Sequence, residues 1–399
     1  MIALRLVVLG LGVALGVFYP FIPVILASRG FSPAQIGLVA SIGAIGFTLA
    51  VPAWGHIADV RFGRARTLQV CAIGGAAAVG AMLGQWPPII LALLFMAYWV
   101  FESSWQPLAD ALTVNLVDRR RYGRVRLLTS LSFAVSSIGA GFLYDTAGFD
   151  AAYVLAVIAA ATIAVAASRV PDVGRAHLAD AVPDPNDGSK TRSPSRPWLG
   201  SAGVALRVAP RLGGVLIAVT LINITIISGF TYLPLRLGDL GSPPSDVALS
   251  AGISALAEIP AMLVAARVAQ RIGLRGMFVG SALIYGVATS SWIVLDTAQV
   301  IIATRLITGV AFAWILVCVV LTIARLLPSE LQATGQSLYQ TFGFGVAAIV
   351  ANIVGGLLYQ YIGHGAVFGL GTVLAISAAT LGWIVFPRDA RLTPAVTPA

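Results

Sequence analysis

Apolar residues fill stretches of about 20 residues or more along this chain, and short polar segments between them hold nearly all of the charge. A helix of that length crosses the hydrocarbon core of a bilayer, whereas a membrane β-barrel shows shorter segments of alternating polarity. The pattern predicts an all-α polytopic membrane protein with twelve transmembrane helices in two six-helix bundles. The expected helices cover residues 4–28, 35–58, 67–85, 88–117, 124–145, 150–168, 207–236, 246–270, 275–294, 298–326, 331–361 and 365–386.

One polar segment is much longer than the others and divides the chain. Residues 169–206 are rich in Pro, Asp, Ser and Arg and have no helical period, so we expect a linker there. The expected organisation is an N-terminal bundle over 1–168, this cytoplasmic linker, a C-terminal bundle over 207–386 and a cytoplasmic tail over 387–399.

Composition agrees with a membrane protein and argues against other classes. Of 399 residues, 58% are hydrophobic and 10% are charged, which is far from the balance of a soluble domain. The net charge of +9 lies mostly in the linkers, so we interpret it as a topology signal and expect no nucleic-acid partner. Cys71 and Cys318 lie in different apolar runs, which excludes a CxxC metal site, and we expect no cofactor.

Positive charge also predicts the orientation. With successive linkers on alternate sides, Arg29, Arg236 and Arg305 fall at or near one side, and the other Lys and Arg residues fall on the opposite side. Basic residues gather on the cytoplasmic side of membrane proteins. We therefore expect both termini in the cytoplasm of a multi-pass monomer in the lipid bilayer of a bacterial-type inner membrane.

The two halves share a short motif. With an offset of 211 residues, segment 21–37 lies over segment 232–248 without a gap, and three residues match: Pro23 with Pro234, Gly30 with Gly241 and Pro33 with Pro244. Transporters with two parallel repeats place their substrate site at the repeat interface, near the middle of the bilayer.

The loop after the second expected helix reads GHIADVRFGRAR, residues 55–66, and resembles the signature loop of the major facilitator superfamily. It has one residue more than the family pattern between Asp59 and Gly63. We expect a gating loop made of Gly55, Asp59, Arg61, Gly63 and Arg64, in which the charges form a latch at the moving interface. A purely topological role for these charges is the alternative.

The segment PLADALTVNLVDRRRYGRVRLLTSLSF, residues 107–133, resembles the fourth and fifth helices of lactose permease, nucleoside proton symporters and phenylpropionate permeases. The resemblance implies that Asp110 and Arg126 belong to the substrate site and that Phe133 stands where a tryptophan stacks on sugar in lactose permease. Segments 257–273 and 324–345 resemble later helices of the nucleoside and phenylpropionate branches. Many relatives have a histidine in the tenth helix where this chain has Thr308, so a histidine-based proton relay does not carry over.

The residues themselves also point to this region. Asp110 and Arg126 lie at a similar depth on adjacent antiparallel helices, about 8 to 12 Å inside the cytoplasmic end, so they can pair. Glu102, Gln106 and Asp110 have the spacing i, i+4, i+8, which predicts one helix face directed at the cavity. A substrate or coupling role is favoured for Asp110 and Arg126 because charges inside a membrane are costly, and a static ion pair is the alternative. For Glu102 both interpretations stay open.

A second charged pair is expected in the other half. Glu258 lies twelve residues after Asp246, and Arg305 lies nine residues after Asp296, so we expect similar depths and contact between them. An intramembrane carboxyl group that loads and releases a proton suits a coupling role, so we assign proton coupling to Glu258 and Arg305, with packing as the alternative.

Uncharged candidates are less specific. Asn223, Trp314 and Tyr339 are assigned to the cavity, although aromatic residues of membrane helices more often pack or face lipid. Six glycines of the fifth and eleventh helices are expected to allow close helix contact: Gly139, Gly141, Gly343, Gly345, Gly355 and Gly356.

Together these features predict a secondary transporter that moves a small organic solute, of the nucleoside, sugar or aromatic acid class, by alternating access and proton symport. A drug/proton antiporter is the first alternative, but residues 6–28 lack the acidic residue often found in the first helix of multidrug exporters. A non-transporting solute sensor is the second. We expect no enzyme, because HExxH, GxSxG and P-loop motifs are missing from the sequence.

Overall fold

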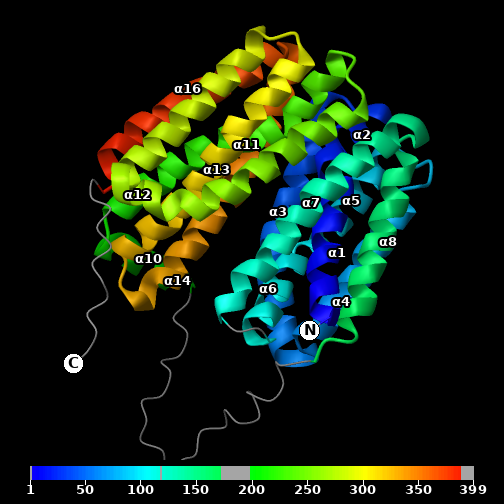
Figure 1. Cartoon of the computed structure of the whole chain (residues 1–399), viewed down its shortest axis with the longest axis horizontal. Coiled ribbons are helices and arrows are strands. Elements are labelled where there is room, and N and C mark those ends of the chain that lie inside the picture. Colours follow the sequence, from blue (N-terminus) through cyan, green and yellow to red (C-terminus); the bar gives the residue numbers. More distant parts are fainter. Residues whose placement is uncertain (1, 117–118, 172–197, 388–399) are drawn as a thin grey trace, which may run out of the picture.

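The protein is described here from a computed structural model that covers residues 2–116, 119–171 and 198–387, with backbone only at 115, 119–124, 126, 198–201 and 329–330. Every regular element in these ranges is helical (Figure 1). The elements are α1 (Ile2–Phe18), η1 (Tyr19–Phe21), α2 (Ile22–Ser28), α3 (Pro33–Ile57), η2 (Ala58–Phe62), α4 (Arg64–Ala81), α5 (Pro88–Glu102), α6 (Trp105–Leu116), α7 (Arg119–Ala147), α8 (Asp150–Ala167), α10 (Trp198–Val208), α11 (Arg211–Asp239), α12 (Pro244–Val294), α13 (Ala298–Leu326), α14 (Ser329–Leu338), η3 (Tyr339–Val346), α15 (Ala347–Tyr361) and α16 (His364–Val385).

The twelve predicted spans are confirmed. Within the described residues, ten helical segments are long and apolar enough to cross a membrane. One of them, α12, is two helices, because Gly273 adopts φ 77° and ψ 162° and turns the chain between them. The twelfth span is α4, whose first turn holds Arg64 and Arg66 and lowers its mean hydropathy.

A helix occupies the end of the expected linker over 169–206. Residues 198–208 form α10, which contacts α14 and α11. The rest of the expected linker, from 172 to 197, and the tail from 388 lie outside the described residues.

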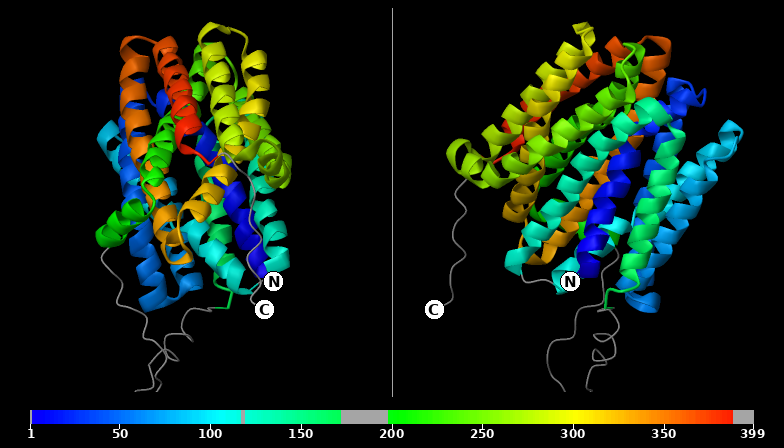
Figure 2. Two further views of the ribbon diagram at one scale, coloured as in Figure 1. Left: turned by 90° about the vertical axis from the view of Figure 1, so that its left-hand side faces the viewer. Right: turned by 45° about the vertical axis from the view of Figure 1, so that its right-hand side comes forward.

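Two groups of helices make up the molecule, α1 to α8 and α10 to α16, as Figures 1 and 2 show. They touch at the end that holds the turns at Gly30, Gly148, Gly241 and Gly363, here called the closed end. They diverge toward the end where α1 begins, here called the open end (Figure 1). The apolar core of the first half continues into Tyr232 of the second half at the closed end.

Helices α3 and α15 belong to different halves and pack closely against each other at two glycines. A Cβ atom at Gly37 of α3 would overlap the carbonyl oxygen of Asn352 on α15. A Cβ atom at Gly356 would lie 2.8 Å from the carbonyl oxygen of Pro33. The two helices could not pack this closely with a larger residue at either position. Small residues allow the same close backbone contact in other membrane helix pairs.

Helices α7 and α12 meet in the same way on the other side of the closed end. A Cβ atom at Gly141 would overlap Ala248 and lie 3.0 Å from the Cα atom of Ser245. Across the same contact, a Cβ atom at Gly252 would lie 2.6 Å from Ile138. The predicted close contact is confirmed at Gly141 and Gly356, whereas Gly139 has open space around it.

Hydrogen bonds between the halves also gather at the closed end, where each would break if the halves separated there. They join the Ser41 hydroxyl to the Ile349 carbonyl oxygen (3.2 Å), the Ala34 amide to Gln360 Oε1 (3.2 Å) and the Ser245 amide to Asp145 Oδ1 (2.9 Å).

The repeat seen in the sequence has a structural counterpart. Gly30 and Gly241, matched at the offset of 211, have φ values of 83° and 74°, which non-glycine residues rarely adopt. Just before each turn, an arginine of the first helix of its half donates to a carbonyl oxygen in the loop that follows the third helix. Arg29 donates to Gly84 at 3.2 Å, and Arg236 donates to Leu295 at 3.3 Å.

The extra residue in the gating loop is absorbed by a π-helical turn. Residues 58–62 form η2, and a π turn holds one residue more than an α turn. The chain then reaches Gly63 at φ 80° and ψ 164°, nearly the conformation of Gly273 in the second half. The offset between equivalent glycines accordingly falls from 211 at Gly30 to 210 at Gly63.

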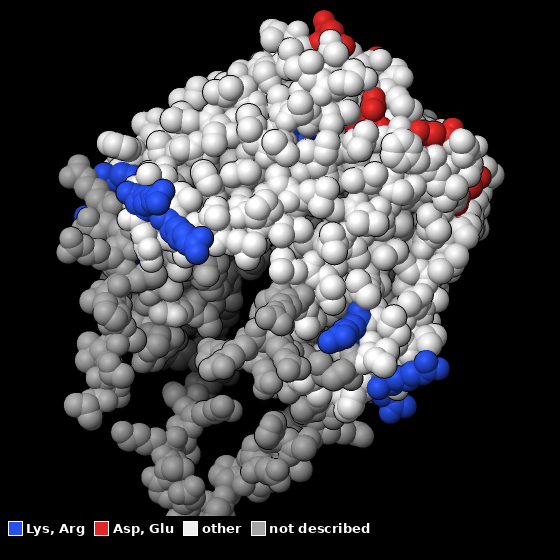
Figure 3. Space-filling view, viewed as in Figure 1, with Lys and Arg blue, Asp and Glu red and all other residues white. Residues whose placement is uncertain are grey.

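Charge is separated along the molecule. Figure 3 shows acidic side chains at the closed end and basic ones at the open end, where the surface is hollowed between the halves. The open end holds arginines 61, 64, 66, 267, 271 and 275, on η2, α4 and α12, and the closed end holds aspartates 145, 150, 239, 246 and 296.

Replacing Gly141 by leucine tests the contact at the closed end. The new side chain meets the backbone of α12, and overpacking of about 1–3 kcal/mol shifts the equilibrium away from closure roughly 5- to 150-fold. Spin labels at Thr146 and Tyr361, both exposed at this end, should report a longer mean distance. Gly139→Leu, on the same helix with open space around it, is the control. Equal distances in both variants would contradict the role of the glycine.

Candidate functional site

The fourth span is broken at the level of Glu102, which corrects the expected continuous helix over 88–117. α5 ends at Glu102 and α6 begins at Trp105. Pro107 explains the break, because its ring has no N–H group and clashes with the carbonyl group four residues earlier, at Ser103. Glu102 therefore does not share one continuous helix face with Gln106 and Asp110.

Side chains satisfy the carbonyl groups that the break exposes. The Val100 carbonyl oxygen accepts from Trp54 Nε1 of α3 at 2.8 Å and from the Ser103 hydroxyl at 2.8 Å. The Ser104 hydroxyl donates to the Phe101 carbonyl oxygen at 3.1 Å. These hydrogen bonds stabilise the break, which places Glu102 at the end of α5.

Glu102 is buried and interacts electrostatically with Tyr19 and Tyr98. Tyr19 belongs to η1, a short 3₁₀ turn that contacts α11 and α12 of the other half, yet 48% of the residue is exposed. η1 therefore places Tyr19 next to the second half. Tyr19 is not among the residues predicted from the sequence, although Pro20 and Pro23 mark an interrupted helix there.

The other candidates of the first half lie on α6 and α7. Gln106 and Asp110 are half-buried on α6. Arg126 lies on α7, but its side chain is outside the described residues, so its pairing with Asp110 stays a prediction. Phe133 is half-buried, and its backbone packs against Gly12 and Gly16 of α1.

Arg305 is the most buried charged residue of the second half, with 3% of its surface exposed. Its Nη1 donates to the Thr308 hydroxyl at 3.2 Å, and its Nε has no hydrogen-bond partner among the described residues. The guanidinium carbon lies 5.3 Å from the ring centre of Phe230 and 6.0 Å from that of Trp292. Aromatic faces thus replace an ion pair as its main partners.

Glu258 and Arg305 are not level, which corrects the expected similar depth. Their helices touch where Gly309 of α13 packs against the Ser254 backbone of α12. Arg305 lies four residues before this contact and Glu258 four residues after it, so the two are offset by about 12 Å along the helices. They interact electrostatically, together with Tyr285, but among the described residues no ion pair joins them.

Trp314 and Asn223 both make structural hydrogen bonds. Trp314 Nε1 donates to the Ala261 carbonyl oxygen of α12 at 3.2 Å. Asn223 Nδ2 donates to the Gly343 carbonyl oxygen at 2.5 Å, inside the π-helical segment η3. Tyr339, the first residue of η3, is buried beside Asn223. π-helical segments are frequent at functional sites, and this one lies in the middle of the eleventh span.

In the predicted gating loop the structure brings two charges together. Arg64 Nη2 lies 3.5 Å from Asp59 Oδ1, with both side chains partly exposed. Gly63 supplies the turn between η2, which holds Asp59, and α4, which begins at Arg64, whereas Gly55 has open space around it. Arg61 is exposed at the end of η2. Both partners of this ion pair belong to one half, so a latch between the halves stays a prediction.

A model of the MFS_1 like family matches residues 6–370. The chain belongs to this family. It is 26% identical over 361 residues to the maltose permease of Geobacillus stearothermophilus, covering 89% of this chain and 86% of that protein. It is therefore a non-enzymatic secondary transporter of the major facilitator type that resides in a membrane and moves a small molecule.

Solved structures of other transporters share the fold of this chain. The nucleoside transporter NupG superposes with a TM-score of 0.76 at 14% identity, covering 96% of this chain and 97% of that one. A D-xylose-proton symporter superposes with a TM-score of 0.66 at 16% identity, covering 97% of both chains. The two-bundle fold expected from the sequence is confirmed.

Two buried arginines, Arg305 and Arg236, allow a comparison of how much each charge contributes to stability. Arg305→Met removes a buried cation without an ion pair and keeps a side chain against the aromatic rings, so stability should be unchanged or higher by up to about 4 kcal/mol. Arg236→Met removes the 2.6 Å bond to Asp296 and the bond to Leu295, so stability should fall by about 1–3 kcal/mol. Thermal unfolding in detergent compares them. A similar loss of stability in both variants would contradict this expectation and show that Arg305 stabilises the fold.

Proposed function

We propose that this transporter moves a small hydrophilic solute of the sugar or nucleoside class by proton symport, with the site in the space between the two halves. The observation that carries the proposal is Glu258, a half-buried carboxyl group in the middle of a membrane span without an ion pair among the described residues. A charge held there without a structural partner is costly, so a functional role is the default. The maltose permease, nucleoside transporter and xylose-proton symporter to which the chain is similar support this solute class.

The proton is proposed to act through the charge of the cluster around Arg305. With Glu258 ionised, Glu258 and Arg305 are neutral together, and with Glu258 protonated the cluster carries the single charge of the arginine. Proton binding therefore changes the net charge buried between α12 and α13. The offset of about 12 Å between the two groups leaves room for a solute or a helix movement to change their interaction.

The solute is proposed to bind between polar and aromatic side chains contributed by both halves. Glu102, Gln106, Asp110, Arg126 and Phe133, together with Tyr19, represent the first half. Asn223, Trp314 and Tyr339 represent the second. Hydroxyl-rich solutes match such a set, because charged and amide side chains pair with hydroxyl groups while aromatic faces cover the ring.

The open end is proposed to face the cytoplasm. The arginines of the open end and the aspartates of the closed end support this orientation, because positive charge gathers on the cytoplasmic side. In this orientation α1 begins and α16 ends on the cytoplasmic side, and the conformation is closed to the outside. We further propose a monomer with bundles over 1–168 and 207–386, a linker over 169–206 and a tail from 387, in which the Asp59 loop acts as a latch when the open end closes.

Glu258→Gln tests the coupling role. A glutamine cannot release a proton, so accumulation of radiolabelled maltose or uridine, whichever the parent transports, driven by a pH gradient in proteoliposomes should be lost. Exchange of the same solute across the membrane should persist, because it needs no net proton movement. Asp246→Asn, near the closed end of the same helix, is the control. Accumulation by Glu258→Gln at the rate of the parent would remove this residue from coupling.

Asp110→Asn and Arg126→Ala test the solute site of the first half. Loss of a hydrogen bond to a charged group should weaken binding about tenfold or more in each variant. Isothermal titration of purified protein with the transported solute measures the affinity directly. Arg267→Ala removes an exposed arginine outside the proposed site and should bind as the parent does. Parental affinity in both site variants would leave Asp110 and Arg126 as a packing pair.

A further inference from the structure

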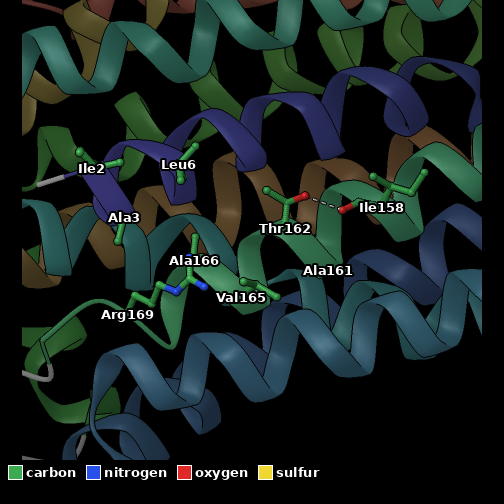
Figure 4. Close-up of a pocket in the computed structure, with 9 residues that line it drawn as sticks. All are labelled: Ile2, Ala3, Leu6, Ile158, Ala161, Thr162, Val165, Ala166 and Arg169. Carbon is green, nitrogen blue, oxygen red and sulfur yellow. Dashed lines mark hydrogen bonds between the residues drawn. The ribbon is translucent and has the colours of Figure 1, made fainter.

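A groove runs along the outer surface of the first half, between α1 and α8 at the open end. It has a volume of about 840 Å³, in the range of small-molecule sites. Figure 4 shows three α1 residues along one side and six residues of α8 and its end along the other. Its lining is Ile2, Ala3, Leu6, Ile158, Ala161, Thr162, Val165, Ala166 and Arg169.

The groove is apolar except at one end. Thr162 is its only polar residue apart from Arg169, and the Thr162 hydroxyl already donates to the Ile158 carbonyl oxygen at 2.8 Å (Figure 4). The lining therefore offers no polar group for a hydrophilic solute along its length. A hydrocarbon chain fits such a surface, because it demands no hydrogen bonds.

Arg169 closes the groove at the open end. Its side chain extends over Ala166 toward Val165 in Figure 4. Among the described residues no hydrogen bond or ion pair engages its guanidinium group. Asp150, the only acidic residue of α1 and α8, lies at the closed end and pairs there with Arg29 at 3.2 Å. Asp59 in the loop before α4 pairs with Arg64. No described side chain therefore competes with an external anion for this arginine.

The position of the groove places it in lipid. Four of its apolar residues are strongly exposed although they belong to membrane spans: Ile2 (77%), Leu6 (42%), Ile158 (56%) and Val165 (55%). No residue of the second half lines it, so it lies apart from the proposed transport route. Arg5 lies on the same exposed side of α1 and adds a second positive charge at this end.

We propose that this groove is a binding site for one anionic phospholipid of the leaflet at the open end. An acyl chain lies along α1 and α8, and the headgroup phosphate pairs with Arg169, since a guanidinium group binds phosphate through two parallel hydrogen bonds. The bound lipid fills the groove between a helix at the centre of the bundle and a helix at its edge. The site is independent of the transported solute.

Lipid titration of the purified full chain in detergent tests the proposal. Dioleoyl phosphatidylglycerol should raise the melting temperature saturably, and native mass spectrometry should detect one retained lipid. Dioleoyl phosphatidylcholine, with the same acyl chains, should bind more weakly, and inorganic phosphate alone should give no shift. Arg169→Gln should weaken phosphatidylglycerol binding about fivefold, as expected for one basic group at an anionic lipid.

Two further variants keep the test decisive. Ala161→Phe fills the groove from an exposed position and should weaken both lipids while Arg169 is intact. Arg271→Gln removes an exposed arginine at the same end of the molecule but outside the groove, and it should bind as the parent does. The proposal is overturned if Arg169→Gln and Ala161→Phe both bind phosphatidylglycerol as the parent does. It is also overturned if Arg271→Gln weakens binding as much as Arg169→Gln, or if phosphatidylcholine binds equally well.

Discussion

The structure depends on the distance at which four helices cross at the closed end. Each of α3, α7, α12 and α15 places a glycine where a single methyl group would meet the facing helix. In a membrane, apolar surface gains little from leaving lipid, so helices associate through close packing and hydrogen bonds. Contacts made this close are lost quickly once the helices move apart. Contacts of this kind suit an end that must separate during alternating access.

The hydrogen bonds between the halves suit such a two-state contact. They are few, and most use a backbone group on one side, so each can be exchanged for water when the halves part. The arginines of the same end are bound differently. Arg29 and Arg236 each bind inside their own half, to an aspartate and a loop carbonyl oxygen, so they strengthen each bundle without tying the bundles together. The arginine bonds therefore strengthen each half, while the bonds between the halves can break and form again.

The length of the apolar runs was enough to predict the spans and the two halves, because the bilayer imposes a length on every apolar helix. Side-chain placement within the spans was predicted less well. The break after Glu102 depends on one proline four residues beyond the affected carbonyl group. The depth of Arg305 relative to Glu258 depends on where α12 and α13 touch, which Gly309 determines and residue counting from loop ends does not. Tyr19 was missed because its place beside the second half depends on long-range contacts of η1 with α11 and α12. α10 was missed because it packs on α14, a long-range contact that local composition does not reveal.

The π-helical turn before Gly63 has a consequence for how the two halves diverged. An extra residue inside an α-helix rotates everything after it by about 100°, which would turn the buried face of α4 away from its neighbours. Confined to η2, the insertion leaves Gly63 in the conformation of Gly273 and α4 in its place. Descendants of a duplicated bundle can therefore change the length and charge of this loop independently while each keeps its packing. The loop is a place where one half can acquire a specialised role that the other lacks.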